Sequence, residues 1–191
     1  MRLHECKRIG LISSAVLGLC ALSAHAQQEQ GPCLRISAAC EAAGFALGMA
    51  NEGAGLWLNC INPIMQVGPQ GPTASKALPQ VDPHIVASCK ATNEAALLVA
   101  RQLSTGRFAD VVTNFTPEMT SALPASKLAQ DWNDVAARMG PLRKIGTPWS
   151  VRSGAATAVP LQFEKDPGHL LVALEGGRIG GLWIKPGNPP L

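Results

Sequence analysis

Hydrophobic residues recur with a helical period through the middle of the chain. Apolar side chains return every three or four positions, as on a helix with one buried face. In the last such segment, 126–139, the buried face is expected to carry Leu128, Trp132, Val135 and Met139. The helices predicted from this period span 93–104, 108–115 and 126–139.

From Lys144 onward the period changes from 3.6 to two, which predicts β-strands. Glycine-containing turns at 166–168 and 176–177 separate the alternating runs as hairpins, and 186–191 form a frayed tail. After a first strand near Lys144, the alternating runs are 159–165, 170–175 and 180–185. Helices followed by strands predict an α+β fold, with the helices packed on one face of a curved four-stranded antiparallel sheet.

A small helical unit rich in cysteine is expected before this fold. Its first helix is predicted from an N-cap at Ser37 to Ala50, and its small residues face the segment 56–60. A flexible Pro/Gly connector over 67–80 leads to a short helix that starts at Asp82 and reaches Cys89. The expected domains are therefore a cysteine-rich unit over 27–91 and an α+β domain over 92–185.

Residues 1–26 have the pattern of a signal peptide. A basic start, an apolar run over 9–22 and an Ala-His-Ala cleavage site at 24–26 follow one another. A membrane anchor would need about 20 apolar residues, and lipidation at Cys20 would need a small residue where Leu19 stands. Cleavage before Gln27 is the favoured interpretation, and it predicts a periplasmic or secreted protein.

Removing this segment changes the charge balance. The loss of Arg2, Lys7, Arg8 and Glu5 reduces 16 basic and 13 acidic residues to 13 and 12, so the net charge falls from +3 to +1. No long cluster of Lys and Arg remains, which argues against a nucleic-acid partner. No further membrane-spanning run is expected.

Four cysteines remain after cleavage: Cys33, Cys40, Cys60 and Cys89. An oxidising compartment favours disulfides, and four cysteines allow three pairings, among which the sequence does not choose. We favour the nested arrangement, Cys40 with Cys60 and Cys33 with Cys89, since it closes two short helices on each other. A zinc site is the alternative, but the chain lacks the usual C-x2-C spacing. No metal and no cofactor are expected.

The order of motifs between Leu98 and Trp183 resembles a bacterial domain of unknown function. The motifs lie at 105–108, 114–115, 128–132, 139–141, 159–164 and 177–182. That domain is often found ahead of secreted α/β-hydrolases. The resemblance implies a layout similar to the ketosteroid-isomerase-like and cystatin-like folds, and it implies no particular activity. No hydrolase domain follows before Leu191, so a companion role is expected to act through a separate protein. The first part resembles, more loosely, short helical cysteine-rich repeats.

The chain offers no coherent catalytic set. A ketosteroid-isomerase-like site uses a carboxylate base with a tyrosine or a protonated acid, yet the chain has no tyrosine. Asp131 and Asp134 are expected on a solvated helix face, His169 on the surface at a strand start, and His84 in a helix's first turn. No G-x-S-x-G motif occurs, and the glycines of 176–181 suit a hairpin better than a phosphate loop.

Large aromatic residues suggest binding instead. Four of them are predicted to line a concavity between the third helix and the sheet, although core packing explains them as well: Trp132, Trp149, Phe163 and Trp183. We therefore expect an exported, non-catalytic module that binds a small ligand or an envelope protein. The alternatives are a small isomerase or hydrolase that uses Asp131, Asp134 or Glu164, and a structural or inhibitory partner.

Overall fold

The computed structural model describes residues 31–67, 71, 73–151 and 155–188. The expected signal peptide, part of the connector and the end of the tail lie outside these residues. The helices are α2 (Pro32–Ala42), α3 (Asn62–Met65), α4 (Pro83–Ser104), α5 (Phe108–Val112), α6 (Pro117–Ala122) and α7 (Ala125–Met139). The strands are β1 (Leu142–Ile145), β2 (Trp149–Ser150), β3 (Thr157–Phe163), β4 (Pro167–Glu175) and β5 (Arg178–Pro186).

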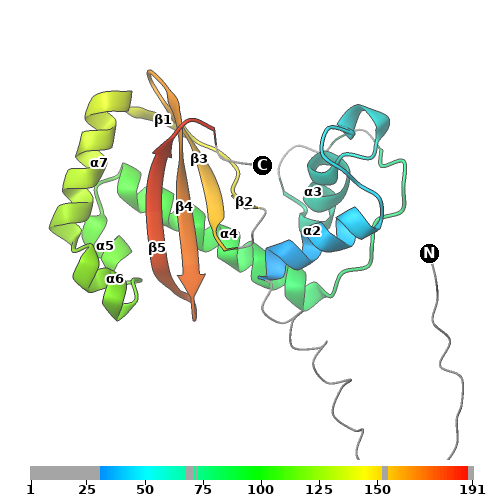
Figure 1. Ribbon diagram of the computed structural model, residues 1–191, viewed down its shortest axis with the longest axis horizontal. Helices are drawn as coiled ribbons and strands as arrows, with labels where there is room; N and C mark the ends of the chain where they lie inside the picture. Colours follow the sequence, from blue (N-terminus) through cyan, green and yellow to red (C-terminus); the bar gives the residue numbers. More distant parts are fainter. Residues whose placement is uncertain (1–30, 68–70, 72, 152–154, 189–191) are drawn as a thin grey trace, which may run out of the picture. The chain divides into compact units, whose positions relative to one another are not determined.

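The strands form one antiparallel sheet, which confirms the α+β fold (Figure 1). The order of its strands is β1-β3-β4-β5, and β2 pairs with β3 at residues that β1 does not reach. The described residues therefore hold five strands, where the sequence predicts four. The predicted Gly176–Gly177 hairpin is present, with positive φ at both glycines and Glu175 paired with Arg178. The preceding turn falls at 164–166, because Pro167 and Gly168 already pair with β3.

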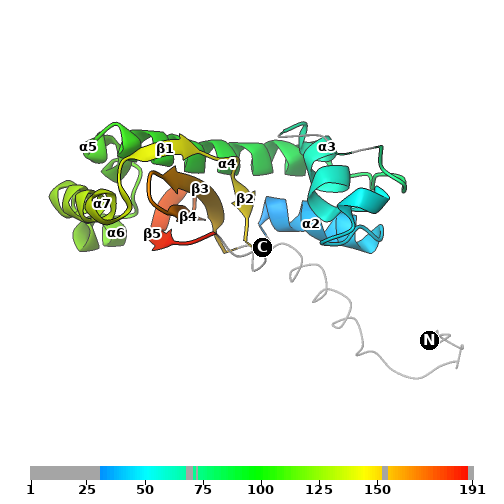
Figure 2. The ribbon, with the colours of Figure 1, turned by 90° about the horizontal axis from the view of Figure 1, so that it is seen from above.

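The helices α4 and α7 pack on one face of this curved sheet, and Figure 2 shows α4 running along that side. Side chains from both helices meet alternate residues of β3 and β4, because successive strand residues point to opposite faces. Members of this core include Val99, Leu103, Leu128, Trp132, Val135, Met139, Val159, Leu161, Phe163, Leu170 and Val172. The predicted buried face of 126–139 is therefore confirmed.

A second hydrophobic cluster surrounds the cysteines of the N-terminal half. It includes Ile36 of α2, Phe45, and Leu56 and Ile61 of a π-helical segment, Leu56–Ile61. The structure joins Cys33 to Cys89 and Cys40 to Cys60, the same two pairs that the sequence analysis favours. Each of these four sulfur atoms is therefore part of a disulfide.

The first helix lies earlier in the chain than the sequence analysis predicts. It begins at Pro32 and ends at Ala42, and the Ser37 hydroxyl donates to the Cys33 carbonyl inside the helix, so the N-cap assignment is wrong. Gly44, at φ +87°, ends the helix: its N–H donates to Glu41 O and the next N–H donates to Cys40 O. This is a Schellman motif, which glycine adopts at low cost.

The middle of the chain also differs from the sequence prediction. Separate helices were expected on either side of residues 90–92, but α4 runs unbroken from Pro83 to Ser104, through the expected division at 91 and 92. No Pro or Gly interrupts this stretch. The two hydrophobic clusters thus share one helix, and residues 31–191 form one compact unit. Within the described residues, no helix is both long enough and apolar enough to cross a bilayer.

The helix predicted over 108–115 ends at Val112, where α5 stops. Phe115 instead forms a bridge with Ile179 of β5, which draws the backbone out of the helix. Thr116 then caps a further short helix, α6, by accepting a hydrogen bond from Met119 N at 3.2 Å. These elements close the end of the core beneath α7.

Candidate functional site

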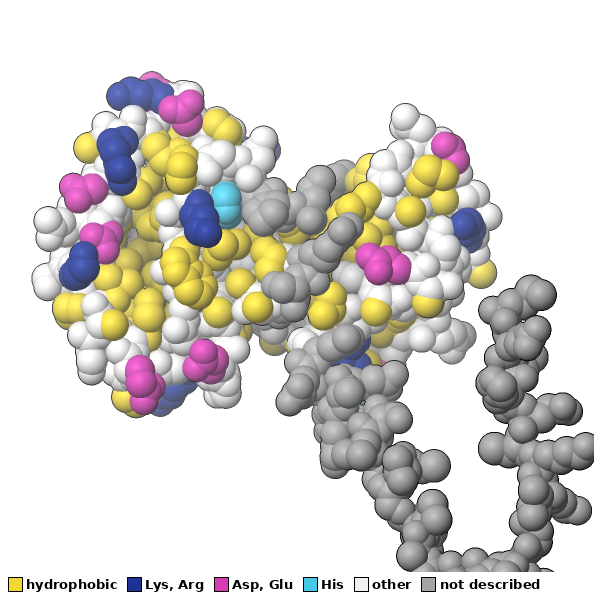
Figure 3. Space-filling model, in the orientation of Figure 1, with side chains coloured by type: hydrophobic (Ala, Val, Ile, Leu, Met, Phe, Trp, Pro, Cys, Tyr) yellow, Lys and Arg dark blue, Asp and Glu magenta, His cyan; other side chains and the backbone are white. Residues whose placement is uncertain are grey.

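The four aromatic residues predicted to share a pocket are not brought together. Trp132 and Phe163 pack against each other in the core with ring centroids 6.0 Å apart, and both are nearly inaccessible to solvent. Trp149 lies on β2. Trp183 is 49% exposed and pairs with Leu171 on the sheet face turned away from α4, where hydrophobic side chains gather (Figure 3).

The carboxylates considered for catalysis all face solvent. Asp131 pairs with Lys127 at 3.1 Å on α7, and Glu164 pairs with Arg143 at 2.8 Å. Asp134 is exposed on α7. None of the three is buried in the described structure, so none supplies the buried carboxylate that the alternative isomerase or hydrolase was based on.

His169 is not a surface residue, and that expectation is wrong. Only 4% of it is exposed, because the chain after β5 folds back over it. Its Nδ1 lies 2.9 Å from the carbonyl oxygen of Gly187, and Gly187 N donates to Pro167 O. Since a carbonyl only accepts, Nδ1 carries the hydrogen in this bond. His169 thus anchors the end of the described chain, while His84 lies exposed in the first turn of α4.

A different place in the fold holds an apolar pocket of about 310 Å³, which we call the central pocket. Its walls come from α2, the π-helical segment, α4 and the loop between β1 and β2. The residues that matter most below are Ser37, Trp57, Met65, Asn93, Pro148 and Trp149. Its volume lies within the range of small-molecule sites.

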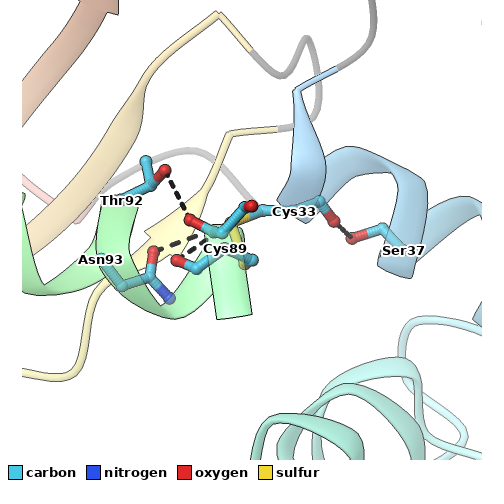
Figure 4. The surroundings of a disulfide bond; sticks show 6 residues. Cys33, Ser37, Cys89, Thr92 and Asn93 are labelled. Carbon is cyan, nitrogen blue, oxygen red and sulfur yellow. Dashed lines mark hydrogen bonds between the residues drawn. A yellow bond between two sulfur atoms is a disulfide. The ribbon is translucent and has the colours of Figure 1, made fainter. Parts of the chain in front are cut away.

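The Cys33–Cys89 disulfide forms part of the pocket wall. It joins the first turn of α2 to α4, with the two Cα atoms 4.8 Å apart (Figure 4). The side-chain oxygen of Asn93 lies 4.0 Å from Cys33 Sγ, one helical turn beyond Cys89. One covalent bond thereby fixes the distance between two walls of the central pocket.

Two tryptophans form another part of the pocket wall. Trp57 of the π-helical segment and Trp149 of β2 lie with ring centroids 6.4 Å apart at an interplanar angle of 59°. Tilted aromatic pairs at this distance attract each other. The buried Nε1 of Trp57 has no hydrogen-bond partner among the described residues. Burying an unpaired N–H costs about 1–3 kcal/mol, so a ligand oxygen within reach would be stabilising.

None of the residues that line the central pocket carries a formal charge. Its polar groups are neutral hydroxyls and amides, including those of Ser37, Asn93 and Thr147. The described residues also contain no group of three His, Cys, Asp or Glu side chains placed to hold a metal ion. The chemistry that the pocket offers is therefore apolar contact with a few neutral hydrogen bonds.

Of the four aromatic residues predicted to line a pocket, only Trp149 lines the central pocket. Sequence reasoning missed Trp57, Asn93 and the loop before Trp149, because they lie in segments far apart along the chain. Thr147 and Pro148 stand next to Trp149, and a Pro-Trp pair in a loop between strands was the available signal.

Comparisons of the chain with models of known protein families, with curated proteins and with solved structures find no match.

Proposed function

We propose that this chain is an exported binding module that takes up a small apolar ligand in the central pocket. The observation that carries the proposal is the uncharged, Trp-lined cavity of about 310 Å³ beside the Cys33–Cys89 disulfide. Predominantly apolar lining with a few placed polar groups is typical of ligand sites. This proposal moves the predicted binding site from the concavity between helix and sheet to the boundary between the two hydrophobic clusters.

Export supports the proposal through the disulfides. Disulfides persist in the periplasm and outside the cell and are rare in the cytosol, and two close the N-terminal cluster. Residues 1–26 have the sequence of a cleavable signal peptide. The resemblance to the ketosteroid-isomerase-like layout stays a prediction, and the proposal does not depend on it.

The proposed export predicts a defined mature N-terminus. Expression of the full chain in a Gram-negative host should place the protein in the periplasmic or culture fraction, beginning at Gln27 and without free thiols. Intact-mass measurement with and without alkylation tests both points. Replacing Ala26 with a large residue should block processing, because signal peptidase needs small residues at this site. Recovery of the uncleaved, reduced chain from the cytosol would contradict the proposal.

The pocket itself can be tested by filling it. Ser37 of α2 lines the central pocket, whereas the neighbouring Ala38 is exposed. We expect the native protein to bind the uncharged fluorescent probe N-phenyl-1-naphthylamine saturably at one site. Ser37→Phe should weaken this binding by about tenfold or more, a loss of about 1.4 kcal/mol, because its ring occupies the cavity.

Two variants serve as controls for this experiment. Ala38→Phe adds the same ring to the next position of the helix and should bind the probe like the native protein. Ser37→Ala removes the hydroxyl that donates to Cys33 O without adding bulk and should also bind normally. Absence of saturable binding by the native protein, or equal binding by the properly folded Ser37→Phe variant, would contradict the proposed function.

An envelope protein as partner is the second candidate. It is favoured by one observation, the exposed Trp183 beside Leu171 on the outer face of the sheet. Exposed hydrophobic patches often mark interaction sites. The central pocket is the stronger basis, because five separate segments of the chain and a disulfide bond form its walls.

A further inference from the structure

A larger cavity of about 560 Å³, which we call the basic end, lies beside the central pocket. Both cavities share five wall residues: Met65, Val67, Asn93, Thr147 and Pro148. The shared residues place the two cavities side by side, and we treat them as two parts of one groove between the cysteine cluster and the edge of the sheet. A ligand long enough to fill the central pocket can therefore extend into the basic end.

The basic end contains the charges that the central pocket lacks. Its cations are Lys90 and Arg101 of α4 and Lys144 of β1, and its anion is Glu94. Lys90, Glu94 and Arg101 are spaced at i, i+4 and i+11, which places them along one stripe of α4. None of the three cations has an ion-pair partner within the described part of the chain. The net charge of this end is thus +2.

The opposite end of the groove has a different character. A cavity of about 320 Å³ there shares Ser37, Trp57 and Ser150 with the central pocket. Its lining includes the acidic Glu41 and no Lys or Arg. The groove is therefore polarised, with cations at one end, no charge in the middle and an anion at the other end.

We infer that the ligand is an elongated amphiphile with a single carboxylate, of the fatty-acid type. The apolar chain lies in the central pocket against Trp57 and Trp149, and the carboxylate lies in the basic end. This inference depends on the proposed function and specifies its ligand class. Charge complementarity sets the orientation, since a carboxylate is attracted by Lys90, Arg101 and Lys144 and repelled by Glu41 at the other end.

The inference predicts discrimination among ligands that share one apolar chain. Dodecanoate should displace N-phenyl-1-naphthylamine from the native protein about five- to tenfold more tightly than dodecanol, because several solvent-exposed cations each contribute modestly. Dodecyltrimethylammonium should bind more weakly than dodecanol. Raising NaCl to about 0.5 M should shrink the difference between dodecanoate and dodecanol, because salt screens exposed charges. All measurements use monomeric ligand, below its micelle-forming concentration.

Variants of the basic end test whether its cations cause the preference for dodecanoate over dodecanol. The triple variant K90Q/R101Q/K144Q should bind dodecanoate no more tightly than dodecanol, because Glu94 is then the only charge left in the lining of the basic end. The triple variant R35Q/K165Q/K185Q removes three exposed cations outside the groove, and it should keep the preference for dodecanoate. Glu94→Gln should increase that preference, because it removes the negative charge beside the cations.

The outcomes separate the two proposals. Equal binding of dodecanoate and dodecanol by the native protein, or an unchanged preference in K90Q/R101Q/K144Q, would overturn the inference and leave the proposed function intact. Failure of the native protein to bind the uncharged probe or any of the three ligands would overturn the proposed function, and the inference with it.

Discussion

Replacing Trp132 with alanine should lower the free energy of unfolding by about 3–5 kcal/mol, the range for removing a large aromatic side chain from a packed core. Trp132 lies on the buried face of α7, is only 7% exposed and packs against Phe163 of β3. Removing the indole would leave unfilled space between α7 and the sheet. Urea unfolding followed by far-ultraviolet circular dichroism measures the change without depending on tryptophan emission.

Trp183→Ala is the matched control for this experiment. Its side chain is half exposed on the other face of the sheet, so its removal should cost about 1 kcal/mol or less. A loss of similar size in both variants would contradict the assignment of Trp132 to the core and of Trp183 to the surface. The same two variants also test the pocket predicted from the sequence. If Trp132 and Trp183 lined one pocket together, the two substitutions should cost similar amounts of stability.

Removing the Cys33–Cys89 disulfide should lower the free energy of unfolding by about 4 kcal/mol. The bond closes a loop with a sequence separation of 56, and the chain-entropy model gives this value for a loop of that size. The variant C33A/C89A should show the loss in urea unfolding under non-reducing conditions. It should also bind N-phenyl-1-naphthylamine more weakly, because α2 is no longer held at a fixed distance from α4 beside the central pocket.

The second disulfide provides the comparison. Cys40–Cys60 spans a separation of only 20, for which the same model gives about 3 kcal/mol. It also lies outside the lining of the central pocket. C40A/C60A should therefore lose less stability than C33A/C89A and retain more of the probe binding. The reverse order would show that local packing, and not loop length, sets the contribution of each bond.

The position of the candidate site between two clusters gives α4 a central role. Cys89 and Asn93 line the central pocket, while Lys90, Glu94 and Arg101 line the basic end. Further along, Val99 and Leu103 enter the core beneath the sheet. One continuous helix thus connects the disulfide-closed cluster, the groove and the α+β core. Because the helix is continuous, it holds the central pocket and the basic end in a fixed arrangement along its length.

Some features of the site were unpredictable for a definite reason. Leu182, Trp183 and Ile184 are consecutive apolar residues, so their alternation does not say which of them faces the core. The pairing of Leu171 with Trp183 decides it, and this turns Trp183 outward. His169 is buried because Gly187 folds back onto it, a contact across 18 residues that no local pattern encodes.

Local patterns in the sequence determined the elements whose physics is local. The buried face of 126–139 follows from helical spacing, and the turn at Gly176–Gly177 follows from the positive φ that glycine permits. Only the tertiary structure decided where a cavity forms, because its walls come from α2, the π-helical segment, α4 and the loop before β2. A cavity forms where side chains from segments far apart in the sequence leave space unfilled, and this is a property of packing in three dimensions.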